Sequence, residues 1–127
     1  MNAPDRNDIL HLPFGAKKVT ITEDTRLPNA VEIKIEREDH TLGGMLKEML
    51  LRDEDVLFAG YKHPHPLEYH IVLKLQTSTH IKPIDALKRS IERLILELAT
   101  LKERFMAEVA RVKTAKNLDQ YAMDADD

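Results

Sequence analysis

The sequence predicts an α/β fold of the α+β type, in which a short helix and a long C-terminal helix lie on one face of a four-stranded sheet. Three observations lead to this prediction. Apolar and polar residues alternate in three short segments, as in strands that bury one face, and a fourth short segment is apolar throughout. Two further segments repeat apolar residues every three or four positions, which is typical of amphipathic helices. The longer of these segments covers residues 83–113.

Length and composition favour a single domain. The chain has 127 residues, of which 43% are hydrophobic, and this supports one modest core. We expect residues 17–116 to form the domain. Residues 1–16 read as an extended lead-in because Pro13 and Gly15 interrupt any regular element, and the acidic end, residues 117–127, is expected to be disordered.

Charge and residue types argue against several functional classes. The 19 basic and 22 acidic residues are dispersed and give a net charge of −3, so no basic stripe is available for a nucleic-acid backbone. The absence of cysteine removes disulfides, thiolate metal sites and cysteine nucleophiles. No apolar signal core follows Met1, and no apolar run approaches the ~18 residues of a membrane span. We therefore expect a soluble intracellular protein that binds neither nucleic acid directly nor a membrane.

The first two strands are expected on either side of a turn. Residues 17–22 alternate weakly, and residues 23–29 contain the turn formers Asp24, Pro28 and Asn29. The next segment, residues 30–37, places charged side chains on one face and three β-branched residues on the other: Val31, Ile33 and Ile35. This pattern predicts a half-buried strand.

A capped amphipathic helix is expected next. Either Asp39 or Thr41 can cap its free N–H groups, and apolar residues follow at helical spacing: Leu42, Met45, Leu46, Met49 and Leu50. Gly43 and Gly44 in its first turn indicate a close backbone approach, because glycine is costly in a helix. Two interpretations stay open. The chain's own sheet packs on these glycines, which we prefer, or a second subunit does.

Two more strands are expected before the long helix. Residues 56–61 are apolar on both faces, which predicts an inner strand. The stretch His63-Pro64-His65-Pro66 should be a loop, because each proline lacks an N–H group. Residues 69–77 alternate again and predict a last half-buried strand.

The long helix carries an apolar seam, which we define as the residues that recur along it at alternating steps of three and four: Ile84, Leu87, Ile91, Leu94, Leu98, Leu101 and Phe105. Three residues widen it: Ile95, Met106 and Val109. Pro83 suits the first helical position, and Asp85 complements the helix dipole. The first half of the helix can be the domain's own core helix, but from about Leu98 too little chain remains to cover the seam. Leaving five such side chains exposed would forgo on the order of 10 kcal/mol, so we expect a partner.

The segment at the start of the first helix does not support catalysis. Asp39, His40 and Thr41 have the composition of a proton relay, but three adjacent residues at a helix start point in different directions. A capping role is preferred. Gly43-Gly44 matches no phosphate-binding loop. We expect a non-enzymatic protein without a cofactor.

Three histidines raise the question of a metal. His63 and His65 share a strand face and His70 could join them, but a zinc site needs further ligands held in fixed geometry. Ordinary loop histidines are preferred, and a histidine-based metal hydrolase stays an alternative. A second alternative is a homodimeric adaptor whose long helices pair with themselves. The mass of the pure chain in solution separates the homodimer from a heterodimer, and stoichiometric metal would identify the hydrolase.

Six short motifs resemble the small alpha-like subunit of eukaryotic and archaeal RNA polymerases. They are Pro28-Asn29-Ala30-Val31, Glu38-Asp39-His40-Thr41-Leu42-Gly43, Leu57-Phe58-Ala59, Gly60-Tyr61, His65-Pro66 and Asp85-Ala86-Leu87. The resemblance extends from the first residue to about residue 110, and the stretch from Glu38 to Gly43 is its most specific part. The opening residues resemble the RNA polymerase II branch of this family, with the paralogous subunit of polymerases I and III as the alternative. The family is similar in fold to the dimerisation domain of the bacterial alpha subunit.

The resemblance implies a non-catalytic nuclear subunit of RNA polymerase II that heterodimerises with the larger alpha-like third subunit. Such a dimer would form the assembly platform for the two largest, catalytic subunits, and the full complex would include small zinc-binding subunits. The resemblance also implies a partner interface made of the alpha motif, the helix after it and the seam: Asp39, His40, Thr41, Leu42, Gly43, Met45, Leu46, Met49, Leu87, Ile91, Leu94, Leu98, Leu101 and Phe105. The chain departs from the family pattern at Gly44, where asparagine is common, and at Lys82, where an acidic residue is common.

Overall fold

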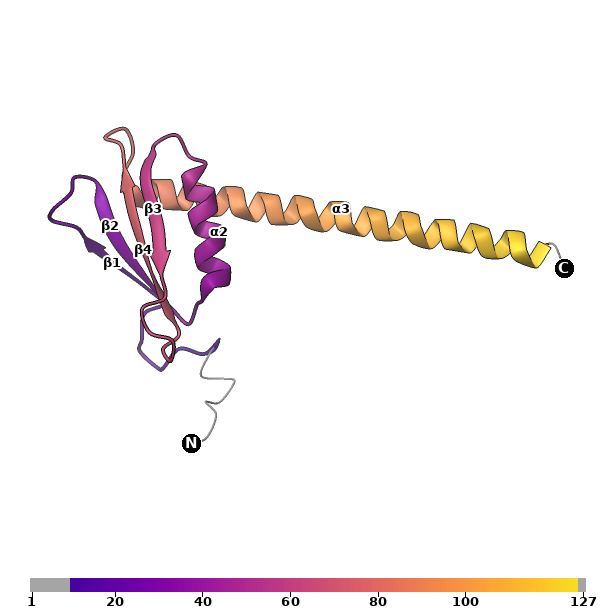
Figure 1. Ribbon diagram of the computed structural model, residues 1–127, viewed down its shortest axis with the longest axis horizontal. Helices are drawn as coiled ribbons and strands as arrows, with labels where there is room; N and C mark the ends of the chain where they lie inside the picture. The colour runs from indigo at the N-terminus through magenta and orange to yellow at the C-terminus, as the bar shows by residue number, and fades with distance from the viewer. Residues whose placement is uncertain (1–9, 126–127) are drawn as a thin grey trace. The chain divides into compact units, whose positions relative to one another are not determined.

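The computed structural model describes residues 10–125 and contains a four-stranded antiparallel sheet (Figure 1). The elements, in chain order, are β1 (Val19–Glu23), β2 (Ala30–Glu36), α2 (His40–Leu51), β3 (Val56–Lys62), β4 (His70–Thr77) and α3 (Pro83–Ala125). The strands are arranged in the order β1-β2-β4-β3. The predicted fold class is confirmed. The chain divides into two compact units, one ending at Leu94 and the other beginning at Ile95.

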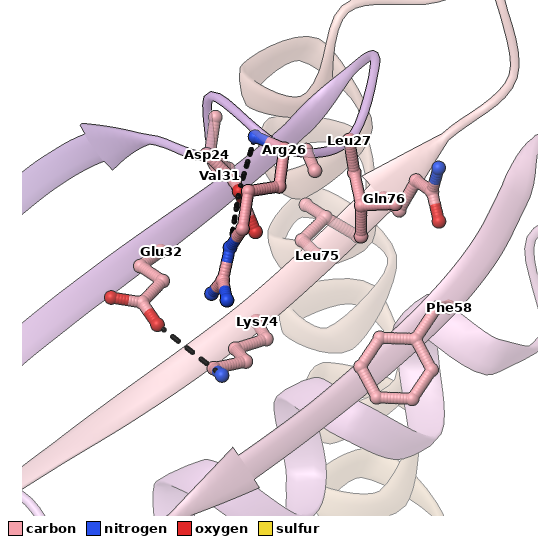
Figure 2. A pocket seen from close by; sticks show the side chains of 10 residues that line it. Asp24, Arg26, Leu27, Val31, Glu32, Phe58, Lys74, Leu75 and Gln76 are labelled. Atoms are coloured by element: carbon pink, nitrogen blue, oxygen red, sulfur yellow. Dashed lines mark hydrogen bonds and ion pairs between the residues drawn. The ribbon is translucent and has the colours of Figure 1, made fainter.

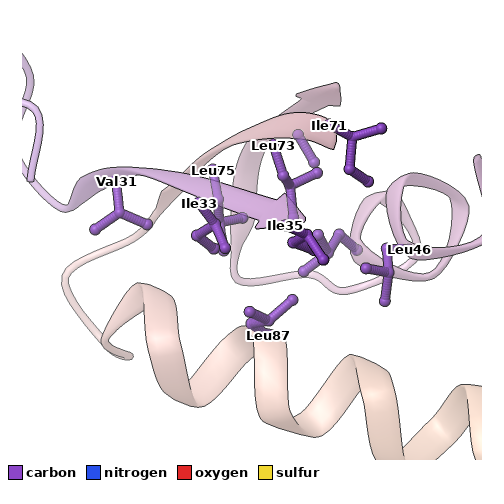
Figure 3. Close-up of a cluster of buried hydrophobic side chains, with 10 residues drawn as sticks. Val31, Ile33, Ile35, Leu46, Ile71, Leu73, Leu75 and Leu87 are labelled. Carbon is purple, nitrogen blue, oxygen red and sulfur yellow. The ribbon is translucent and has the colours of Figure 1, made fainter. Parts of the chain in front are cut away.

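The core of the first unit lies on one face of the sheet. Strands β2 and β4 pair so that Ile33 faces Leu73 and Val31 faces Leu75, and all four of these side chains are buried. Helix α2 adds Leu46 and Leu50, and α3 adds Leu87. Figure 3 shows Leu46 and Leu87 on the same side as the inward residues of both strands. Both helices therefore cover one sheet face, as predicted.

Strand β3 differs from the prediction. Residues 56–62 do form a strand, but it lies at the edge of the sheet, and β4 is the strand between β2 and β3. Ala59 and Tyr61 face the core side opposite Leu75 and Leu73, while Leu57 and Phe58 are exposed. The predicted inner strand was wrong, because a short apolar run does not distinguish a central strand from an edge strand.

Small side chains mark the part of α3 that lies in the core. Pro83, Ala86, Leu87 and Ser90 are buried, and Ala86 and Ser90 are fully so. Positions 83, 86, 87 and 90 share one side of a helix. Leu87 belongs to the predicted seam, but the burial of the small residues Ala86 and Ser90 was not predicted, because the seam was defined by large apolar residues.

The C-terminal helix extends further than expected. We predicted a helix over residues 83–113 and disorder over residues 117–127, whereas α3 continues to Ala125. The physical reason is composition: residues 113–125 contain no glycine or proline and include alanine, lysine, glutamine, leucine and methionine, which favour helix. Residues 126–127 lie outside the described part of the chain.

The predicted lead-in falls partly outside the described residues, which begin at Leu10. Between there and β1, Leu10 and Phe14 are exposed, and the N–H of Ala16 donates to the carbonyl of Pro13 in a turn. Within residues 10–125, no helix combines the length and hydropathy needed to cross a bilayer.

Candidate functional site

The alpha motif is a helix cap. The carboxylate of Asp39 accepts a hydrogen bond from the N–H of Thr41 at 2.9 Å, and the N–H of Gly43 donates to the Asp39 carbonyl at 3.1 Å. His40 turns elsewhere, with its Nδ1 3.0 Å from the hydroxyl of Tyr61. Of the two candidate caps, Asp39 and Thr41, the structure shows that Asp39 caps the helix. Asp39 bonds to the backbone of Thr41 and His40 bonds to Tyr61, so these hydrogen bonds do not link the three side chains to one another.

Gly43 accommodates an aromatic ring of the same chain. A β-carbon at Gly43 would stand 2.5 Å from Cδ2 of Tyr61, which is too close for any real side chain. At Gly44 the space is freer, and the closest atom to such a carbon would be the Tyr61 hydroxyl at 4.0 Å. The first of the two interpretations of these glycines is therefore supported for Gly43, because the approaching group belongs to the chain's own sheet.

Several predicted interface residues are buried within their own unit. Gly43, Leu46, Met49 and Leu87 are buried, and Leu42 and Leu94 are partly buried against the core. These side chains hold the helices on the sheet. Met45 is partly buried, and the exposed members of the predicted surface in this unit are Asp39, His40, Thr41 and Ile91.

The second unit presents the rest of the seam uncovered. The exposed fractions are 47% for Leu98, 64% for Leu101 and 68% for Phe105. Ile95 and Met106, which widen the seam, are exposed too. Because these residues fall at helical spacing within α3, they make an apolar strip along one side of the helix. Such a strip is typical of a surface that pairs with another helix.

Other exposed apolar residues were not predicted as a surface. Leu96 lies in the second unit but off the seam, and Leu118, Tyr121 and Met123 lie beyond the predicted helix end. Large residues outside a regular repeat give no periodic signal, so only the structure identifies them as accessible.

An ion-pair cluster ties the turn before β3 to the start of α3. Arg89 donates from Nε and Nη2 to the buried carboxylate of Asp53, both at 2.8 Å, and from Nη2 to Asp55 at 3.0 Å. Arg93 lies 3.8 Å from Asp53. Burial disfavours the charged form of Asp53, but the hydrogen bonds from the Asp55 N–H and from Arg89, together with both arginine charges, hold its pKa below 3.8. The cluster therefore holds the first turns of α3 against the turn before β3 within the first unit.

Neither the histidines nor the hollows of the described residues form a recognisable reaction centre. His63 stacks edge-on against His40 and His65 lies near His70, but no group of three or more His, Cys, Asp or Glu side chains within residues 10–125 is placed to hold a metal. A hollow of about 580 Å³ lies beside Phe58 and the 24–27 turn (Figure 2). The charges in its lining are paired, Arg26 with Asp24 and Lys74 with Glu32.

Comparison with known proteins gives a consistent answer. Residues 30–104 match the family model described as the RNA polymerase Rpb3/Rpb11 dimerisation domain. The chain is 41% identical over 121 residues to DNA-directed RNA polymerase II subunit rpb11 of Dictyostelium discoideum, covering 95% of this chain and 99% of that one. It is 48% identical to the probable Rpb11 of Caenorhabditis elegans, over 87% of this chain and 90% of the relative. Subunit L of the Thermoplasma acidophilum RNA polymerase shares the fold, with a TM-score of 0.63 and 24% identity over 76% of this chain and 92% of that chain.

Proposed function

This chain belongs to the RNA polymerase Rpb3/Rpb11 dimerisation-domain family, and we propose that it is a non-catalytic, nuclear subunit of RNA polymerase II. In this role it pairs with a larger alpha-like subunit, and the pair forms a platform on which the two largest subunits and the small zinc-binding subunits assemble. The observation that carries the proposal is that the seam residues Leu98, Leu101 and Phe105 of α3 are exposed. The match to the dimerisation domain includes this helix up to residue 104.

The mechanism is burial of apolar surface that the chain cannot cover by itself. Leu98, Leu101 and Phe105 recur at helical spacing, and their exposed fractions are 47%, 64% and 68%. Each such side chain contributes about 1.5–3 kcal/mol when it is fully buried, and a partner helix with a complementary seam would supply this burial. Within the first unit, the start of α3 is anchored through Leu87 and the Arg89–Asp53 pair.

The chemistry of the described residues supports a structural rather than a catalytic role. Asp39 caps a helix and His40 bonds to Tyr61, so the polar residues of the alpha motif serve the fold. We infer that no step of nucleotide addition uses a side chain of this subunit, and that its contribution to transcription is to bring other subunits together.

Co-expression with the larger alpha-like subunit tests the proposal. The mass of the tagged chain is measured by light scattering, alone and after co-expression. The proposal predicts a one-to-one complex, with aggregation or instability of the chain alone. A well-behaved homodimer that ignores the larger subunit would contradict it and would favour a homodimeric adaptor.

A further inference from the structure

Arg37 adopts a backbone conformation that arginine rarely takes. Its φ is +57°, in the left-handed region, where a side chain normally crowds the following carbonyl. The other non-glycine residue of the described chain in this region is Asn29, a type that tolerates it well. The conformation at Arg37 is held by a hydrogen bond from its N–H to the carbonyl of Tyr69, at 2.5 Å. Strain of this kind is often found where a side chain has to be presented in a set direction.

The guanidinium of Arg37 has no partner within residues 10–125. Its Nε is shielded from solvent and donates no hydrogen bond within the described residues. The neighbouring charges, in contrast, are matched. Lys34 lies 3.0 Å from Glu36, and Lys18 lies 3.0 Å from Glu38. His70 has Glu68 at 3.6 Å. Arg37 is therefore a cation without an ion-pair partner among the described residues, whereas the neighbouring charged side chains are paired.

Arg37 lines a hollow that can admit another side chain. The hollow has a volume of about 520 Å³, and its walls include Leu67, Tyr69 and His70. Leu67 is 91% exposed. A charged group beside an exposed apolar one is the combination that protein interfaces use, with a polar contact for register and an apolar contact for burial.

We propose that Arg37 receives a carboxylate from another protein chain at this hollow. Arg37 is partly exposed, and its guanidinium presents a fork of N–H donors that matches a carboxylate. A nucleic-acid backbone suits the site less well, because it calls for a row of free cations, whereas Lys34 and Lys18 are already paired with Glu36 and Glu38. This inference rests on the proposed function in one respect: the chain that supplies the carboxylate is taken to be another subunit of the assembled polymerase.

Zero-length cross-linking of the assembled complex tests this proposal. The full chain carrying Arg37→Lys is tagged, purified with its complex and treated with a carbodiimide, which joins an amine to a carboxylate in direct contact. Mass spectrometry then maps the links. We expect the amine introduced at position 37 to be joined to an aspartate or glutamate of another subunit. The adjacent pair Lys34–Glu36 gives an internal link that shows the reaction worked.

Links from position 37 only to Glu36 or Glu68 of the same chain, a link to nucleic-acid phosphate, or no link while Lys34–Glu36 reacts would each overturn the proposal. Failure of the chain to co-purify with a larger alpha-like subunit is a different result, since it overturns the proposed function together with this inference.

Two substitutions separate binding from folding. Arg37→Gly removes the guanidinium and also the backbone strain, so we expect the melting temperature of the chain to stay constant or rise. Retention in the complex at raised salt should nevertheless fall by roughly threefold to tenfold. Arg26→Gly is the matched control, because Arg26 is an exposed arginine on another turn of the same unit and should leave retention unchanged. Equal retention for Arg37→Gly and the wild type would contradict the assignment.

Discussion

The ring of Tyr61 occupies the space in which a side chain at Gly43 would begin, with Cδ2 2.5 Å from the position of a β-carbon. Tyr61 lies on β3 and Gly43 in the first turns of α2, so this contact sets how closely the helix approaches the edge strand. The Tyr61 hydroxyl also forms a hydrogen bond with His40 Nδ1 at the start of the same helix. The contact with Tyr61 therefore explains the glycine at position 43, but it does not explain the glycine at position 44.

Substitution of the two glycines should have opposite effects. Gly43→Ala forces the ring of Tyr61 to move and should destabilise the chain by about 1–3 kcal/mol. Gly44→Ala meets no atom closer than the Tyr61 hydroxyl at 4.0 Å and should stabilise the chain by up to about 1 kcal/mol, because alanine favours helix over glycine. Urea unfolding of the full chain followed by circular dichroism measures both. Equal effects at the two positions would show that the contact with Tyr61 carries no energetic weight.

The buried hydroxyl of Ser90 should be dispensable. Ser90 is fully buried and its Oγ has no hydrogen-bond partner among the described residues. Burial of an unpaired hydroxyl is unfavourable, so Ser90→Ala should raise the free energy of unfolding by on the order of 1 kcal/mol. Ser90→Leu should lower it by about 1–3 kcal/mol through overpacking. A clear loss of stability in the alanine variant would mean that the hydroxyl has a partner after all.

The Asp53 cluster should make stability depend on acid. The pKa of Asp53 is lowered in the folded chain, so its contribution is fully present above the unfolded value of 3.8 and is lost as the pH falls through the lower folded value. Asp53→Asn should cost about 2 kcal/mol at pH 7 and progressively less below about pH 4.

Thermal unfolding from pH 3 to pH 7 compares Asp53→Asn with the wild type. The control is Glu108→Gln, which removes an exposed pair with Arg111 at i, i+3 and should change little. A constant difference between Asp53→Asn and the wild type across this range would contradict the assigned linkage.

The parts of the fold that depend on periodicity could be predicted from the sequence. Val31, Ile33 and Ile35 alternate with charged residues, and that pattern leaves only one face of β2 for the core. The apolar spacing after Asp39 likewise indicated α2, and Asp39 proved to be its cap.

The position of β3 at the edge of the sheet could not be predicted, because it depends on pairing of β4 with β2, a contact between segments about 40 residues apart in sequence.

The contact of α3 with the core could not be predicted either. It uses Ala86 and Ser90, whose small size matters more than their hydropathy. Periodicity indicated which residues of the long helix share a side, but it could not say which of them the chain itself buries. Leu87 and Leu98 belong to one repeat, yet the first is in the core and the second is exposed.

A change of charge on the seam tests the account of α3 in the second unit. Leu98→Asp places a carboxylate at a position that we propose is buried by the partner, and the cost of desolvating an unpaired charge should amount to several kcal/mol of association free energy. The residues up to Leu94 should stay folded, since Leu98 lies outside that unit.

Leu96→Asp is the matched control. Leu96 is 69% exposed in the same helix and points about 160° away from Leu98 around the helix axis, so the same charge there should be tolerated.

The most direct measurement is the mass, by light scattering, of these two variants after co-expression with the larger alpha-like subunit. The account predicts a one-to-one complex for Leu96→Asp and its loss for Leu98→Asp, with the circular dichroism of both chains unchanged in the sheet region. If both variants form the complex equally well, the seam is not the pairing surface, and the central claim is wrong.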